Sequence, residues 1–189
     1  MNALQRLIPG LELVYDGFVR VWKGPDKHEI VSSTDSVAFL IHIVDRDLVV
    51  FVHQRRAPMV SDKNPTGELL ETPAGRFDCA LTAEELIAKE AGEEVGATVD
   101  PAKVILFNEG IPLAMCPGIL TEKQFLGLVR IYSSEIENEE RIFGVDADEQ
   151  IRREFIPVTS LSLLPYDDLK TYALVQRFLH WLREDGRSI

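Results

Sequence analysis

Residues 82 to 95 constrain the fold more than any other part of the chain, because they carry a complete set of helix signals. Thr82 and Glu85 form a T-x-x-E capping box at the start of the segment. Apolar side chains then recur at helical spacing, and Gly96 follows where helices often end in a left-handed conformation. We therefore predict one well-defined helix here.

The flanking sequence has the pattern of strands. Two apolar, β-branched runs at residues 35–44 and 47–56 are separated by Asp-Arg-Asp, which predicts a buried hairpin. A second amphipathic helix is predicted near the C-terminus, at residues 166–184. Further strands are predicted at residues 11–24, 68–75, 103–111, 123–133 and 153–158. Strands interrupted by a helix and closed by another predict an α+β fold or an α/β/α sandwich.

Two units are expected within the 189 residues. Residues 1–34 form a strand-rich N-terminal arm, and residues 35–189 form the main domain. The net charge of −11 argues against a nucleic-acid partner, although a bound cation would still let such a protein hold a phosphate. No apolar run is long enough to cross a membrane. Cys79 and Cys116 are the only cysteines, which favours free thiols and a cytoplasmic location.

Three carboxylates gather on the predicted helix of residues 82–95. Glu90, Glu93 and Glu94 lie about one turn apart, where like charges repel. A solvated acidic face is one interpretation of this spacing, and a hard divalent cation shared by the carboxylates is the other. Glu85 precedes Lys89 by four residues, so these two side chains are expected to pair.

The flanking residues favour the cation. The stretch from Gly75 to Ala97, GRFDCALTAEELIAKEAGEEVGA, resembles the Nudix box, G-x5-E-x7-R-E-U-x-E-E-x-G-U, in which U is aliphatic. Two positions depart from that pattern, since Lys89 replaces the usual arginine and Leu81 replaces the first glutamate. The resemblance implies a Nudix fold, which is an α+β fold in the form of an α/β/α sandwich with a mixed β-sheet, here with an N-terminal β arm.

Outer segments are similar to the branch of this family that contains ADP-ribose and nucleoside diphosphate sugar pyrophosphatases. They are VHQRRAP (52–58), ETPAG (71–75), CPGILTEKQFLGLV (116–129) and DLKTYALVQRFL (168–179). The resemblance implies hydrolysis of a nucleotide sugar that depends on Mg²⁺, with Mn²⁺ as the alternative ion. ADP-ribose, split into AMP and ribose 5-phosphate, is the first expectation for the substrate. UDP-sugar hydrolysis and a non-catalytic nucleotide sensor are the alternatives.

The resemblance also implies roles for individual residues. The metal ligands are expected to be Glu90, Glu94, the backbone carbonyl of Ala74 and Glu149 from a later acidic loop. Ala147 stands where a catalytic glutamate is usual, so the general base remains open. The candidates for it are Glu149, Asp148, Asp146 and Glu93.

Substrate contacts are expected from Arg56, which matches an arginine that grips a phosphate, and from aromatic residues of the arm. Tyr15, Phe18 and Trp22 are candidates for stacking on the base, with strand packing as the other interpretation. Members of the branch form homodimers in which the arm lends residues to the partner's site, so a homodimer is expected here. His42, His53 and His180 are interpreted as core or surface residues.

Overall fold

A computed structural model describes residues 8–25, 28–138, 141–144 and 150–186. The chain forms a three-stranded sheet and an eight-stranded mixed sheet. The first contains β1 (Glu12–Asp16), β2 (Arg20–Lys23) and β3 (Glu29–Ser32). The second contains β4 (Ser36–Ile43), β5 (Leu48–Arg55), β6 (Glu68–Glu71), β7 (Ala74–Arg76), β8 (Ile105–Leu106), β9 (Leu113–Ala114), β10 (Lys123–Ile131) and β11 (Arg152–Pro157).

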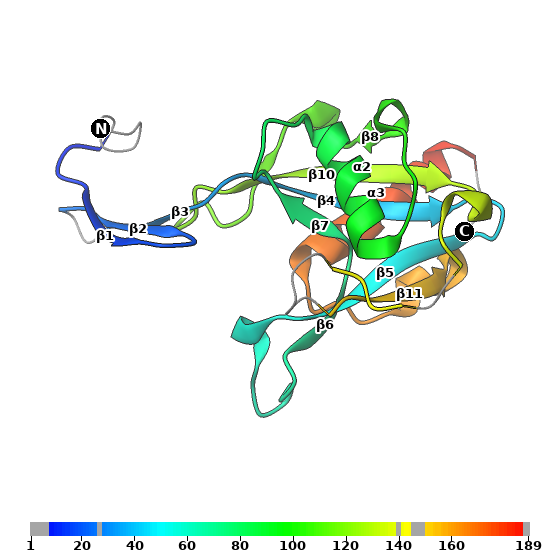
Figure 1. Cartoon of the computed structure of the whole chain (residues 1–189), viewed down its shortest axis with the longest axis horizontal. Helices are drawn as coiled ribbons and strands as arrows, with labels where there is room; N and C mark the ends of the chain where they lie inside the picture. The colour runs from blue at the N-terminus through cyan, green and yellow to red at the C-terminus, as the bar shows by residue number, and fades with distance from the viewer. Residues whose placement is uncertain (1–7, 26–27, 139–140, 145–149, 187–189) are drawn as a thin grey trace.

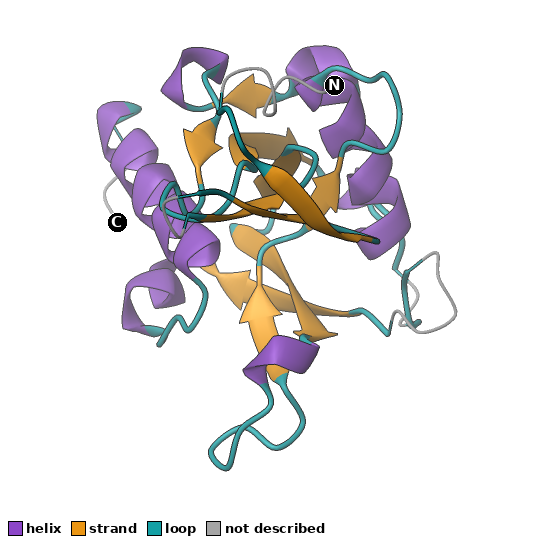
Figure 2. Cartoon of the chain, turned by 90° about the vertical axis from the view of Figure 1, so that its left-hand side faces the viewer, coloured by secondary structure: helices purple, strands orange, loops and turns teal. Residues whose placement is uncertain are grey.

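Two α-helices cover the larger sheet, α2 (Ala83–Val95) and α3 (Leu169–Glu184). Figure 2 shows them on opposite sides of the strands. The described residues also contain five 3-10 segments: η1 (Ala57–Met59), η2 (Pro101–Lys103), η3 (Asn108–Gly110), η4 (Ser133–Glu135) and η5 (Val158–Leu163). The predicted α/β/α sandwich is confirmed. Among the described residues, no helix is long and apolar enough to cross a membrane.

The central strand β4 shows why the protein has two hydrophobic cores, one on each face of the larger sheet. β4 is buried throughout, and its successive side chains point to opposite faces of the sheet. Phe39 and Ile41 pack with Leu86 of α2 on one face, whereas Leu40 packs with Phe178 of α3 on the other. β10 pairs with β4 in parallel, and β5 pairs with it antiparallel, so the sheet is mixed as predicted.

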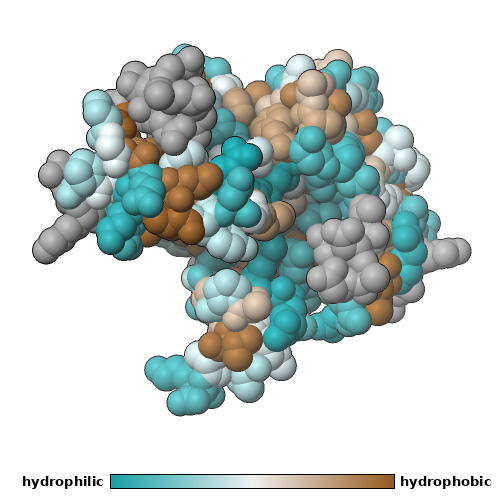
Figure 3. All heavy atoms as spheres, turned by 60° about the vertical axis from the view of Figure 1, so that its left-hand side comes forward, coloured by the Kyte–Doolittle hydropathy of each residue, from teal (hydrophilic) through white to brown (hydrophobic). Residues whose placement is uncertain are grey.

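The smaller sheet forms the N-terminal arm and extends away from the main body (Figure 1). Val31 joins the two parts, because its backbone bonds to Ile119 and Thr121 on the main domain. Exposed apolar side chains gather on the arm, where Figure 3 shows a brown patch. They are Leu13, Val14, Tyr15 and Phe18.

One predicted strand is mostly wrong. Residues 103–111 contain only the two-residue strand β8, followed by the 3-10 turn η3. Asn108 and Glu109 have φ values of 54° and 55°, a conformation that no strand allows. The apolar run therefore supplies an edge strand and a turn, in which Phe107 is buried beneath α3.

Candidate active site

The site is built where β7 passes the C-terminal half of α2. The N–H of Ala74 donates to the Glu94 carboxylate over 3.0 Å, which links the strand to the helix. A Cβ atom added to Gly75 would lie 2.3 Å from the carboxyl carbon of Glu90. Glycine at this position therefore leaves the space in which the Glu90 carboxylate lies.

The helix has the ends that the sequence predicts. Thr82 accepts a hydrogen bond from the Glu85 N–H, and the Glu85 carboxylate accepts one from the Thr82 N–H. Gly96 ends the helix with a φ of 66°, in the left-handed region. These caps fix the helix start and end, and so fix where its carboxylates point.

The predicted pair between Glu85 and Lys89 is wrong. Glu85 is committed to the capping box, and Lys89 instead contacts Glu93 at 2.7 Å and Glu90 at 3.4 Å. The bond to Glu93 is the main cause that raises the Lys89 pKa. Lys89 thus offsets charge among the clustered carboxylates, while the helix N-terminus holds Glu85.

Burial dominates the electrostatics of the two other carboxylates. Glu94 is only 7% exposed, and desolvation raises its pKa to about 8. Desolvation is also the main cause that raises the pKa of Glu90, against the attraction of Lys89. Two neighbouring carboxylates that are costly to ionise supply oxygen donors suited to a hard cation such as Mg²⁺.

The described residues contain no group of three His, Cys, Asp or Glu side chains arranged to hold a metal by themselves. The predicted ligand Glu149, together with Asp146 and Asp148, lies outside the described residues. The two carboxylates and Ala74 therefore fit a cation as part of a donor set. These are three of the four ligands that the sequence predicts, since Glu149 is the fourth.

A cavity of about 460 Å³ opens over this arrangement. It brings together six of the predicted site residues, Ala74, Glu90, Glu93, Glu94, Arg56 and Phe18. Its other lining residues are Gln54, Gly75, Arg76, Asp78, Lys89 and Gly144. Of these, Gln54 lies within the motif VHQRRAP, but the sequence analysis assigned it no role. Its side-chain oxygen is buried and has no hydrogen-bond partner among the described residues.

Arg56 reaches the cavity from the end of β5, and its Nε donates to Glu71 over 2.6 Å. Glu71 is 1% exposed and also contacts Lys170 of α3. Burial acts to lower the pKa of the Arg56 guanidinium, but the hydrogen bond and the charge attraction to Glu71 outweigh it. The net effect is a raised pKa. Sequence reasoning quoted both Glu71, within ETPAG, and Lys170, within DLKTYALVQRFL, but assigned a role to neither.

The three aromatic candidates of the arm lie in different places, and Tyr15 is exposed but does not line the cavity. Phe18, in the turn between β1 and β2, is 86% exposed and lines the cavity, with the Arg76 guanidinium 4.4 Å from its ring centre. Trp22 does not line the cavity. It is 3% exposed, and its indole N–H donates to Ser32 over 2.9 Å, so it packs inside the arm.

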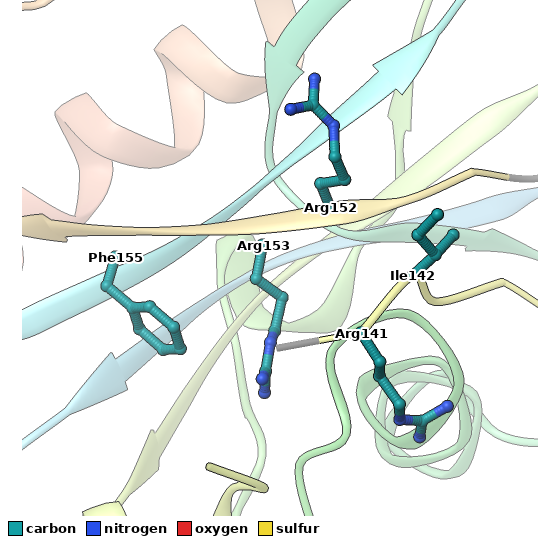
Figure 4. Close-up of a pocket in the computed structure, with 5 residues that line it drawn as sticks. All are labelled: Arg141, Ile142, Arg152, Arg153 and Phe155. Carbon is teal, nitrogen blue, oxygen red and sulfur yellow. The ribbon is translucent and has the colours of Figure 1, made fainter. Parts of the chain in front are cut away.

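A second cavity, of about 390 Å³, contains none of the predicted site residues. Figure 4 shows its lining, Arg141, Ile142, Arg152, Arg153 and Phe155. Its arginines are already occupied. Arg152 pairs with Glu68 at 2.7 Å, Arg141 pairs with Glu137 at 3.0 Å, and Arg153 donates to the Val95 carbonyl at 2.9 Å. This cavity therefore offers little free charge to an anion.

Comparisons with known proteins agree with the site. No family model matches the chain. A GDP-mannose pyrophosphatase of Yersinia enterocolitica is 29% identical over 155 residues, which are 78% of this chain and 75% of that protein. A GDP-mannose pyrophosphatase of Citrobacter koseri is 28% identical over 160 residues, 82% of this chain and 78% of that protein. The crystal structure of an ADP compounds hydrolase superposes with a TM-score of 0.68 at 16% identity, covering 96% of each chain.

The box residues arranged on β7 and α2, the fold and the relatives lead to one conclusion. The chain is similar to Nudix hydrolases of the nucleoside diphosphate sugar pyrophosphatase branch in its box residues, its fold and its relatives.

Proposed function

We propose that this protein hydrolyses the diphosphate linkage of a nucleoside diphosphate sugar in the cavity between the arm, β5, β7 and α2. The observation that carries the proposal is the placement of Glu90 and Glu94 against Gly75 and Ala74. Arg56 adds a cation on the same cavity wall, where it is able to bind a phosphate. One carboxylate-rich side and one cationic side suit a metal–diphosphate substrate.

We propose Mg²⁺ as the ion, with Mn²⁺ as its substitute. Glu90, Glu94 and the backbone of Ala74 would hold it, joined by Glu149. When bound, the ion neutralises phosphate oxygens and lowers the pKa of a coordinated water. The protein's own part is to hold the carboxylates of Glu90 and Glu94 in place through the capped helix and the close-packed glycine.

The general base is proposed to be Glu149, with Glu93 as the alternative. Lys89 already contacts the Glu93 carboxylate at 2.7 Å, so this group begins with one oxygen occupied. Asp146 and Asp148 remain candidates on the same loop as Glu149. The base would take a proton from the attacking water, whose oxygen would form a bond to one phosphorus. The bond between that phosphorus and the bridging oxygen would break, and the bridging oxygen would leave with the other phosphate.

Two substrates are proposed. The motifs that resemble the ADP-ribose branch favour ADP-ribose, giving AMP and ribose 5-phosphate. The name shared by the relatives favours GDP-mannose as the second candidate, giving GMP and mannose 1-phosphate. Phe18 would stack on either base, because an aromatic ring offers the same face to both.

A kinetic panel tests the proposal. ADP-ribose, GDP-mannose and UDP-glucose are incubated with Mg²⁺, and phosphatase-coupled phosphate release is measured. We expect turnover of at least one substrate that is lost when EDTA is added. Binding without turnover by the wild-type protein would instead support the nucleotide sensor.

The exposed free thiols Cys79 and Cys116 suit our further proposal of a reducing, cytoplasmic location.

A further inference from the structure

A chain of alternating charges runs from α3 to the cavity. Asp168 contacts Lys170 at 2.9 Å, Lys170 contacts Glu71, and Glu71 accepts from Arg56 at 2.6 Å. The two inner members are the most enclosed, since the side chains of Lys170 and Glu71 are 11% and 2% exposed. The chain joins residues 99 positions apart in the sequence and ends at the wall of the site.

Each oxygen of Glu71 takes a different cation. Oε1 accepts from the Nε of Arg56, and Oε2 is held by the ammonium group of Lys170. An arginine facing a free carboxylate commonly binds both oxygens through two parallel N–H bonds. Here Lys170 occupies the second oxygen, so Glu71 holds Arg56 by one atom. Among the described residues, the two terminal guanidinium nitrogens have no other hydrogen-bonding or ion-pair partner.

We propose that Lys170 is a positioning residue for substrate binding, because it blocks two-point capture of Arg56 by Glu71. The terminal N–H groups of Arg56 then stay available to a diphosphate in the cavity. This inference rests on the proposed function, and it adds a specific role for α3, a helix on the far face of the sheet.

The anchoring of Lys170 supports this role. Asp168 is the N-cap of α3, and its carboxylate accepts from the N–H and the hydroxyl of Thr171 as well as from Lys170. The N–H of Thr72, next to Glu71, donates to the Thr171 hydroxyl over 2.9 Å. The start of α3 is therefore fixed to the strand end that carries Glu71, and the ammonium group has little freedom to leave Oε2.

Binding of ADP and GDP in the presence of Mg²⁺, measured by calorimetry, tests the proposal. We compare the wild type with Lys170→Met, Lys170→Arg, Glu71→Gln/Lys170→Met and Arg56→Lys. Lys103→Met is the matched control, because Lys103 makes an exposed ion pair with Glu135 at 4.0 Å, outside the cavity. Thermal midpoints are recorded for all variants, so that loss of folding is recognised.

We expect Lys170→Met to weaken binding by roughly tenfold or more, through loss of charge-assisted bonds to the phosphates. The double variant is expected to recover most of that loss, because an amide at position 71 no longer captures the guanidinium as a carboxylate does. A purely structural role would make the double variant no better than the single one. Lys170→Arg and Lys103→Met are expected to bind as the wild type does.

The proposal is overturned if Lys170→Met binds both nucleotides normally, or if the double variant is as weak as the single one. If Lys170→Met does not fold, the nucleotide affinities of the double variant and of Lys170→Arg test the proposal instead. A tenfold loss of affinity in either variant contradicts it. Equal binding by Arg56→Lys and the wild type, or no binding by the wild type, also overturns it. The substrate panel then still reports independently on the proposed hydrolysis.

Discussion

Gly75 and Glu90 are packed so closely that position 75 has no room for a side chain. An added Cβ would lie 2.3 Å from the Glu90 carboxyl carbon and 2.5 Å from one of its oxygens. The φ of Gly75 is not in the left-handed region, so the requirement comes from space and not from backbone conformation. The flexible side chain of Glu90 is able to move aside, so a substitution at position 75 would displace the Glu90 carboxylate.

Gly75→Ala should therefore reduce activity while leaving stability nearly unchanged. The methyl group would displace the Glu90 carboxylate from the proposed cation, and a misplacement of about 1 Å is able to cost roughly a hundredfold in rate. Turnover with Mg²⁺ and the thermal midpoint are both measured. Gly118→Ala is the control, since a Cβ there meets no atom within 4 Å. Full activity of Gly75→Ala would show that Glu90 acts from another position.

Glu94→Gln should remove most activity without unfolding the protein. It deletes one negative charge beside the proposed cation but keeps the shape of the side chain and its acceptor for the Ala74 N–H. Turnover is measured as Mg²⁺ is varied. A variant with nearly full turnover at limiting Mg²⁺ would exclude Glu94 from the metal site.

The metal-free protein should lose stability as the pH rises toward 8. The Glu94 pKa is raised from 4.5 to about 8, so the folded state holds a proton that the unfolded state has released. Stability from this group is complete below about pH 4.5 and is lost as the pH rises through the folded pKa. The raised pKa of Glu90 acts in the same direction.

Thermal midpoints in EDTA between pH 5 and pH 8 measure this effect. Relative to Glu94→Gln, the wild type should become progressively less stable across the range, because glutamine does not titrate. Parallel curves for the two proteins would mean that Glu94 has an ordinary pKa in the folded state.

Thr82→Ala should destabilise the protein by about 1 kcal/mol through loss of the N-cap. The Thr82 hydroxyl accepts the Glu85 N–H over 3.2 Å, and this contact lies outside the cavity. Thr82→Ser keeps the hydroxyl and is the control. Chemical denaturation gives the free energy of unfolding, and Mg²⁺ affinity should fall less than stability does. An unchanged free energy of unfolding would show that the cap contributes nothing.

The sequence predicted well the features that depend on neighbouring residues. The capping box, the left-handed Gly96 and the hairpin of β4 and β5 are set by residues a few positions apart. Glu85 shows the limit of such reasoning. It has two partners within reach, Lys89 at i+4 and the Thr82 N–H, and only the structure shows that the cap prevails.

Features that depend on distant residues were not predictable. Glu71 and Lys170 meet only because α3 packs against the sheet, and no local pattern signals that contact. The aromatic residues of the arm show a second limit. A register shift between Leu13 and Tyr15 interrupts β1, so simple alternation does not tell which aromatic side chains face out. Phe18 lines the cavity, and Trp22 fills the arm.

The last prediction concerns assembly through the arm. All five residues of β1 are exposed, and β1 is an edge strand of the small sheet. An exposed edge with Leu13, Val14 and Tyr15 is a surface that another strand can cover. We expect a homodimer in which the two arms pair about a two-fold axis and bury these side chains.

Deleting residues 1–22 should then produce a monomer whose substrate affinity falls more than its metal affinity, because Phe18 is lost while Glu90 and Glu94 are kept.

Val14→Lys separates the loss of the dimer from the loss of Phe18, since it places a charge on the β1 edge but leaves Phe18 in place. It should weaken dimerisation in light scattering. If Phe18 serves its own chain's cavity, as its contact with Arg76 indicates, Val14→Lys will retain substrate affinity as a monomer. If Phe18 serves the partner's cavity, affinity will fall together with dimerisation. A wild-type protein that is monomeric at micromolar concentration and fully active would contradict the dimer.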